Sequence, residues 1–160
     1  MKLPPFYSTP SEHVEMLSEG LAKTLGIDVS DYLELDLDTG KTQLGYVIGD
    51  ADPKGITHLG QESYELEIEL RLHVPVTKEA NKSNAQRYAL DLSSKIVSSL
   101  KHCCYGLDNQ REVPVIEAND ALAMSYHKRH QYCVRSVVFR QTVYAGVIAQ
   151  ALYDVHFEVT

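Results

Sequence analysis

The sequence predicts an α+β domain, a mostly antiparallel sheet with helices packed on one face, and three observations lead to this prediction. Residues 64–74 alternate between apolar and ionisable side chains without one error, which is the period of a strand with one buried and one solvated face. Residues 85–100 carry apolar side chains at helical spacing. The other strand-like runs are mostly joined by short turns, which favours antiparallel pairing.

The chain has 160 residues, 44% of them apolar, and this length fits one domain over residues 1–160 with a proper core. Three prolines in residues 1–10 predict an extended N-terminal arm. Apolar residues at helical spacing then predict a helix over residues 11–25, capped by Thr9 or Ser11 and ended by Gly26.

A hairpin is expected over residues 32–48, because two alternating runs flank the turn residues 38–41. Residues 49–60 are rich in Gly, Asp and Pro and predict a long loop. The strand of residues 64–74 follows and ends at Pro75, which cannot donate to a ladder. Its length, roughly 36 Å at about 3.3 Å per residue, suggests a strand that reaches past its own core and serves assembly.

Beyond a polar break, the helix of residues 85–100 is expected to turn its charged residues, Arg87, Asp91 and Lys95, to solvent. Gly106 is expected to end this helix. Strands are predicted over residues 113–118 and 132–143 and over a closing run that ends at the C-terminus. Residues 119–129 fit either one helical turn or more strand.

The net charge of −7 is unevenly distributed. Residues 1–80 hold 6 Lys/Arg and 15 Asp/Glu, which gives −9, and residues 81–160 hold 9 and 7, which gives +2. Acidic surface of one copy can therefore meet basic surface of the next. The predicted contact residues for another subunit or partner are Glu65, Glu67, Glu69, Arg71, Lys128, Arg129, Arg135 and Arg140.

Known catalytic motifs are incomplete. Asp38-Thr39-Gly40 resembles an aspartic-protease motif but lacks the distant supporting segment, so it is interpreted as a turn. Gly40-Lys41-Thr42 lacks the earlier glycine of a phosphate-binding loop, where Leu35 stands. No catalytic residue, cofactor or metal is therefore predicted.

An enzyme of another kind remains an alternative. His127, His130 and Cys133 are residue types that bind zinc. His102, Cys103 or Cys104 could complete such a site, and the thiol of Cys103 or Cys104 could act as a nucleophile beside a histidine. Adjacent Lys128 and Arg129 oppose a cation, and an odd number of cysteines without framework spacing argues against a disulfide scaffold.

The element order resembles that of the tail-terminator proteins of long-tailed and contractile-tailed phages, the lambda minor tail protein U type and the Mu-like prophage proteins. The shared features are an N-terminal helix followed by a long strand, a polar break, a long helix, a late strand and a closing strand. In this sequence the last five are residues 62–74, 77–83, 85–100, 132–143 and 152–160.

This resemblance implies a structural virion protein rather than an enzyme. It implies a ring, expected to be a hexamer, that caps the finished tail tube and presents a surface to the head–tail connector protein. Its place would be the tail or neck of the virion, after assembly in the host cytoplasm. A head-completion adaptor or a tube subunit is the alternative within the same class.

Two further partners are considered. A basic run with interleaved aromatic residues in the region of residues 126–140 allows at most weak, non-specific DNA contact in the lumen of a ring. A membrane partner is not expected, because no apolar run approaches the roughly 20 residues of a span.

Overall fold

The computed structural model describes residues 7–57, 60–79, 81–102 and 113–147. Five sequence predictions lie wholly or partly outside these residues: the N-terminal arm in its residues 1–6, the closing strand of residues 152–160, the helix end at Gly106, and the roles of Cys103 and of Cys104.

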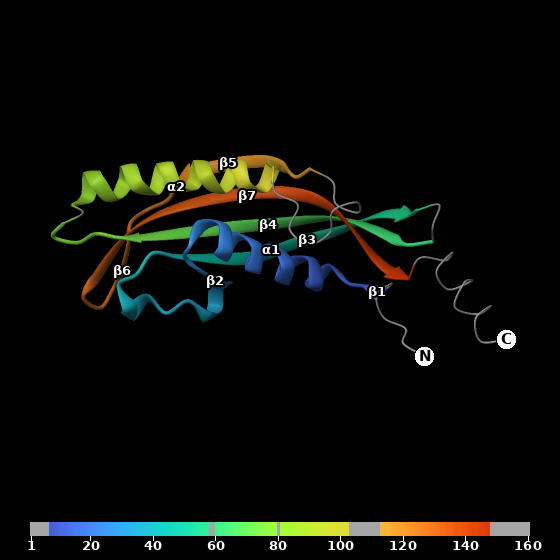
Figure 1. The fold of residues 1–160 in the computed structure, drawn as a ribbon, viewed down its shortest axis with the longest axis horizontal. Coiled ribbons are helices and arrows are strands. Elements are labelled where there is room, and N and C mark those ends of the chain that lie inside the picture. The colour runs from blue at the N-terminus through green and yellow to red at the C-terminus, as the bar shows by residue number, and fades with distance from the viewer. Residues whose placement is uncertain (1–6, 58–59, 80, 103–112, 148–160) are drawn as a thin grey trace.

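The described chain is mixed α and β: a mostly antiparallel sheet of six strands and two helices (Figure 1). The two-residue β1 adds to the end of β7. The elements are, in order, β1 (Tyr7–Ser8), α1 (Pro10–Leu25), β2 (Asp28–Asp31), the 3-10 turns η2 (Tyr32–Glu34) and η3 (Leu37–Thr39), β3 (Gln43–Ile56), β4 (Glu62–Pro75), α2 (Lys82–His102), β5 (Val115–Ala121), β6 (Ser125–His127) and β7 (His130–Val147).

Strand β4 is the central strand of the sheet, and the prediction of a long strand over residues 64–74 is confirmed. It pairs antiparallel with β7 along its whole length and with β3 on the other side. Its apolar face is almost completely buried at Leu66, Ile68, Leu70, Leu72 and Val74. This continuous pairing explains why the strand exceeds the usual length of about 5–6 residues.

Both predicted helices are confirmed. Helix α1 begins after Thr9, whose hydroxyl accepts a hydrogen bond from the Glu12 N–H at 3.4 Å, and it ends at Gly26 in the left-handed conformation with φ 67°. Helix α2 exposes Arg87, Asp91 and Lys95 as predicted. Tyr88 does not belong to its buried stripe, because the side chain is 49% exposed.

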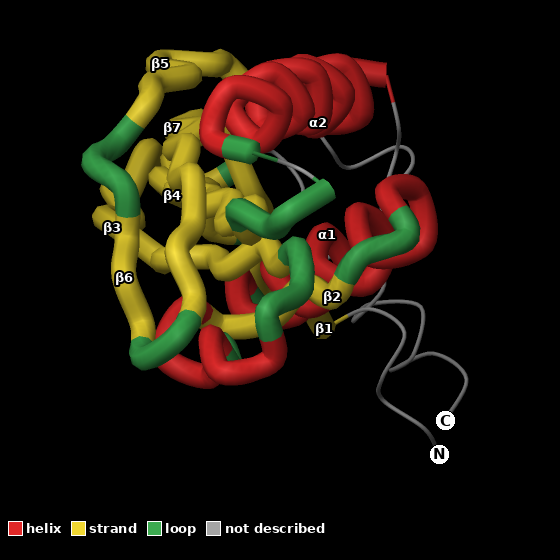
Figure 2. Tube along the Cα trace, turned by 90° about the vertical axis from the view of Figure 1, so that its left-hand side faces the viewer, coloured by secondary structure: helices red, strands yellow, loops and turns green. Residues whose placement is uncertain are grey.

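One core cluster joins the two helices to the sheet. Both helices contact β7, α2 also contacts β4, and the helices touch each other (Figure 2). The buried helical residues include Leu17, Leu21, Ala89, Ile96 and Leu100. They pack with the apolar residues of β4 and with Val137, Phe139 and Val143 of β7.

The predicted hairpin over residues 32–48 is wrong in its first arm. Residues 32–39 form 3-10 turns, because the carboxylates of Asp31 and Asp36 accept hydrogen bonds from the N–H groups of Leu33 and Asp38, at 2.9 and 3.1 Å. Such local bonds compete with a strand ladder. The strand next to β3 is instead β2, which pairs with it in parallel.

The predicted loop over residues 49–60 is also wrong, because β3 continues to Ile56. Pairing with β4 holds these residues in the ladder, and irregular registers near Pro53 and Gly55 absorb the turn-forming residues. We call residues 49–56 the β3 arm. All eight are exposed, and the arm extends past the ends of both helices at the right of Figure 1.

The C-terminal half follows the prediction with longer strands. The expected strand over residues 132–143 is β7, which runs from His130 to Val147. Strand β5 includes part of the expected residues 113–118 and continues to Ala121. The ambiguous residues 119–129 contain the end of β5, the short β6, and a turn at Lys128 with φ 51°.

The ionisable face of β4 is not solvated throughout. His73 is buried, since its ring lies between Tyr32 and Tyr132, with ring centroids 5.9 and 5.8 Å away. The Tyr132 hydroxyl donates to the Leu37 carbonyl and accepts from the Gly40 N–H at 3.2 Å, which ties the η2–η3 segment over this end of the sheet.

His73 is expected to make the fold sensitive to acid. Burial lowers the pKa of His73, and the nearby Arg71 charge lowers it further, against a backbone hydrogen bond at Arg71. The unfolded chain then binds more protons than the folded chain as the pH falls below about 6.5, so stability decreases there. In urea titrations from pH 7 to 5, His73→Phe should reduce this loss, and His102→Phe, at an exposed position, should leave it unchanged. Equal pH dependence in all three proteins would contradict the prediction.

Candidate functional site

The described residues bring only two of the metal candidates together, because His127 and His130 are register partners in the β6–β7 hairpin. The Nε2 atom of His127 lies 2.9 Å from the Asp38 carboxylate, whereas Cys133 is buried with its Sγ 4.0 Å from the Lys82 carbonyl. Burial raises the pKa of the Cys133 thiol, which makes it a poor nucleophile at neutral pH. Among the described side chains there is no group of three or more His, Cys, Asp or Glu that could hold a metal.

Instead, the predicted acidic and basic contact residues meet on one sheet face. Arg140 of β7 lies opposite Glu67 of β4, and its guanidinium contacts carboxylates from three strands. The distances are 2.6 Å to Glu117, 3.0 Å to Glu67, 3.3 Å to Glu65 and 3.9 Å to Asp52. We call these five residues the Arg140 cluster.

The Arg140 cluster has more negative than positive charge. The hydrogen bond from Arg140 lowers the pKa of Glu65, and the charge of Lys54, 3.5 Å away, lowers it further. The same carboxylates raise the pKa of Arg140. The contact to Glu117 is an ion pair rather than an aligned hydrogen bond, since Nε has no hydrogen-bond partner. One guanidinium therefore separates four carboxylates that would otherwise repel each other.

Glu69 and Arg71 are the other two predicted contact residues on β4. They form a second, smaller network beside the Arg140 cluster. Arg71 donates to Glu69 at 2.6 Å, and the Ser136 hydroxyl donates to the other oxygen of Glu69 at 2.6 Å. The Arg71 guanidinium also stacks 4.7 Å from the centroid of the Tyr32 ring. Both side chains are thus held by their own chain.

The other basic candidates lie apart. Lys128 pairs with Asp38 at 3.0 Å at the β6–β7 turn, where Arg129 is exposed. Arg135 is on the opposite sheet face from Arg140 and donates to Asn119 at 2.9 to 3.2 Å. The four basic residues that are close in sequence therefore do not form one patch for nucleic acid.

Sequence reasoning missed three members of this charged surface. Asp52 and Lys54 belong to residues that were predicted to be a loop, and Glu117 stands at a bulge of β5. Their pairing with β4 and β7 depends on strand register, for which the sequence offers no local signal.

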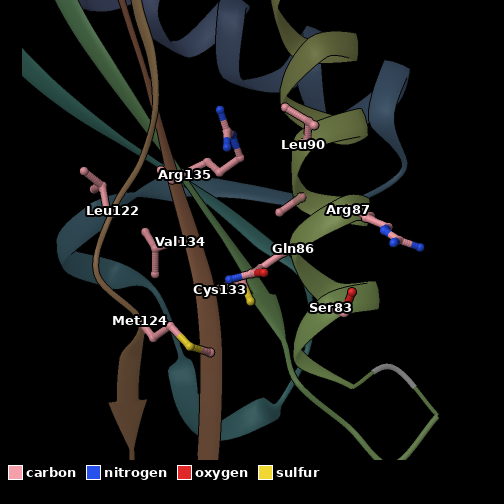
Figure 3. Close-up of a pocket in the computed structure, with 11 residues that line it drawn as sticks. Ser83, Gln86, Arg87, Leu90, Leu122, Met124, Cys133, Val134 and Arg135 are labelled. Atoms are coloured by element: carbon pink, nitrogen blue, oxygen red, sulfur yellow. The ribbon is translucent and has the colours of Figure 1, made fainter.

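An apolar groove lies on the other side of the sheet, between the N-terminal half of α2 and the β5–β6 connection (Figure 3). It has a volume of about 410 Å³. Its floor is buried, at Ala89, Cys133 and Val134. Its walls are exposed, since Leu90 is 47% and Leu122 40% accessible. Gln86 points across it toward Cys133, and Met124 reaches toward β7.

The solvent side of α2 beside this groove is basic. It exposes four cations and one carboxylate, Lys82, Arg87, Lys95, Lys101 and Asp91. None of the four cations forms an ion pair with a described carboxylate. This helix therefore offers uncompensated positive charge to a partner.

None of the described helices combines the length and apolar character that a membrane span needs. Comparisons with protein-family models and with curated proteins find no match for this chain.

Proposed function

We propose that this protein is a structural subunit of a phage tail, a tail terminator that forms a ring on the end of the tail tube. The ring would stop tube growth and present its outer surface to the head–tail connector. In this proposal α1 and α2 cover one face of the sheet, as in the tail-terminator proteins that the sequence resembles, and the opposite face carries the Arg140 cluster.

The observation that carries the proposal is the β3 arm. It extends beyond the part of the molecule that the helices cover (Figure 1), and its outer edge has no strand partner among the described residues, since β2 pairs only with residues 43–46. Ile48, just before the arm, is 51% exposed and Ile56, at its end, is 74% exposed. An exposed strand edge with apolar side chains is a natural surface for assembly.

The charge distribution supports assembly between unlike surfaces. Acidic residues gather around the arm and the Arg140 cluster, and four cations that form no ion pair with a described carboxylate lie on α2. Contact between unlike surfaces of identical subunits generates a ring when its rotation closes. The site chemistry supports an enzyme less well, because the described thiol is buried and the described histidines and carboxylates form no metal-binding group.

The experiment that tests the proposal is capping of tail tubes. Tube protein of the same phage, assembled alone, should grow into tubes of uncontrolled length, and addition of the purified protein should arrest growth with density at one tube end in electron micrographs. Light scattering should report a mass of several chains for the protein, alone or on tubes. A strict monomer that never associates with tubes would refute the proposal, and incorporation along the tube wall would favour a tube subunit.

A further inference from the structure

We propose that the β3 arm of one copy docks into the groove beside α2 of the next copy, so that identical subunits join head to tail. This inference rests on the proposed ring and names the two surfaces that build it. The occupant of the groove is thus a second copy of this chain.

The groove has the properties of a half-buried contact surface. Its floor is closed and well packed, but Leu90 and Leu122 leave apolar surface in water on both walls. Covering such side chains with apolar atoms of a partner removes them from water and is favourable. The volume of about 410 Å³ accommodates a branched aliphatic side chain together with adjacent backbone.

The arm carries the complementary features. Ile56 is the most exposed isoleucine of the described residues, at 74%. The charged residues of the arm and of the facing start of β4 sum to −2, because Asp50, Asp52, Glu62 and Glu65 outnumber Lys54 and the Arg140 that contacts two of them. The exposed charges of α2, with four cations and Asp91, sum to +3. An acidic arm with an apolar tip therefore matches an apolar groove that is lined by Arg87 and lies along a basic helix.

The positions of the two surfaces decide the type of contact. The groove lies beside residues 83–90 at the N-terminal half of α2, toward the left of Figure 1, and the arm ends at the right. One chain cannot place its own arm in its own groove across this length. The contact must therefore join two copies, and because the surfaces differ it is heterologous, the kind that closes into rings.

The test uses one variant for each surface. Ile56→Asp disables the arm and Leu90→Asp disables the groove. Each alone should weaken self-association by at least about thirtyfold, as expected for a hot-spot residue. Leu33→Asp is the matched control, because Leu33 is 91% exposed and belongs to neither surface. Circular dichroism checks that all three proteins fold.

Mixing the two disabled variants gives the decisive measurement. Each retains one good surface, so an equimolar mixture should form a dimer of two chains and stop there. Light scattering measures the mass of the associated protein in solution. If the free wild-type protein is monomeric, the same measurement is made in the presence of tail tubes. Absence of this dimer, or rings from either variant alone, would overturn the arm–groove contact. If the wild-type protein still forms rings, the proposed function survives that result. A wild-type protein that never assembles, even on tubes, refutes both.

Discussion

Replacing Phe139 with alanine is expected to destabilise the fold by about 3–5 kcal/mol, the usual cost of truncating a buried aromatic side chain. Phe139 is completely buried and lies opposite Ile68 at the centre of the β4–β7 pair. Its loss leaves a cavity in the core cluster that contains buried residues of both helices. Because small domains are stable by only about 5–15 kcal/mol, the effect should be a large drop in the urea midpoint.

The control for this substitution is Val138→Ala on the neighbouring residue. Val138 lies on the other face of the sheet, where it is only partly buried, so its truncation should cost clearly less. Equal losses from both variants would mean that the core does not lie on the Phe139 side of the sheet.

Replacing Arg140 with methionine is expected to lower the melting temperature most near neutral pH and least at acidic pH. Methionine retains an unbranched stem but removes the charge that separates Asp52, Glu65, Glu67 and Glu117. At pH 7 the four carboxylates then repel each other, and the melting temperature should fall relative to wild type.

The sign follows from Glu65, whose pKa in the folded wild-type protein lies below 4.5. Its favourable contribution is present above about pH 4.5 and is lost as the pH falls through the folded-state pKa. Without Arg140 the part of this contribution that comes from the guanidinium is absent at every pH, the part from Lys54 remains, and protonation relieves the repulsion among the carboxylates. The difference in melting temperature between the two proteins should therefore be largest near neutral pH and should shrink toward about pH 4.

Arg135→Met provides the matched control on the same strand. Arg135 donates to Asn119 on the opposite face and pairs with no described carboxylate. Its substitution should produce no such convergence of melting curves at low pH. A parallel pH profile for Arg140→Met and wild type would contradict the role given to the cluster.

The elements with a clean local period were predictable from sequence. Apolar side chains repeat every 2 residues in residues 64–74 and every 3.6 residues in α1 and α2. Burial follows these intervals directly. The Thr9 cap and the Gly26 end were also predictable, because each depends on one side chain and its nearest backbone. The sequence identified the acidic and basic contact candidates, but it did not predict which of them lie next to each other.

Prediction was wrong where a local preference competed with long-range pairing. The glycines, Asp50, Asp52 and Pro53 indicated a loop, but the ladder with β4 holds residues 49–56 in β3. The alternation in residues 32–38 indicated a strand, but the Asp31 and Asp36 carboxylates stabilise 3-10 turns there.

The sequence by itself determined the helices, the long amphipathic strand and the uneven charge, since each follows from residues that are adjacent or one turn apart. Tertiary structure alone decided that Arg140 neutralises Glu65 from 75 positions away, that residues 49–56 form an arm, and that Leu90 and Leu122 border one groove. For the strand residues the physical reason is register: a shift of one residue would move their side chains to the other face, and no local pattern specifies which partner each residue takes. For Leu90 and Leu122 the reason is the packing of α2 beside the β5–β6 connection, which joins segments that are distant in sequence.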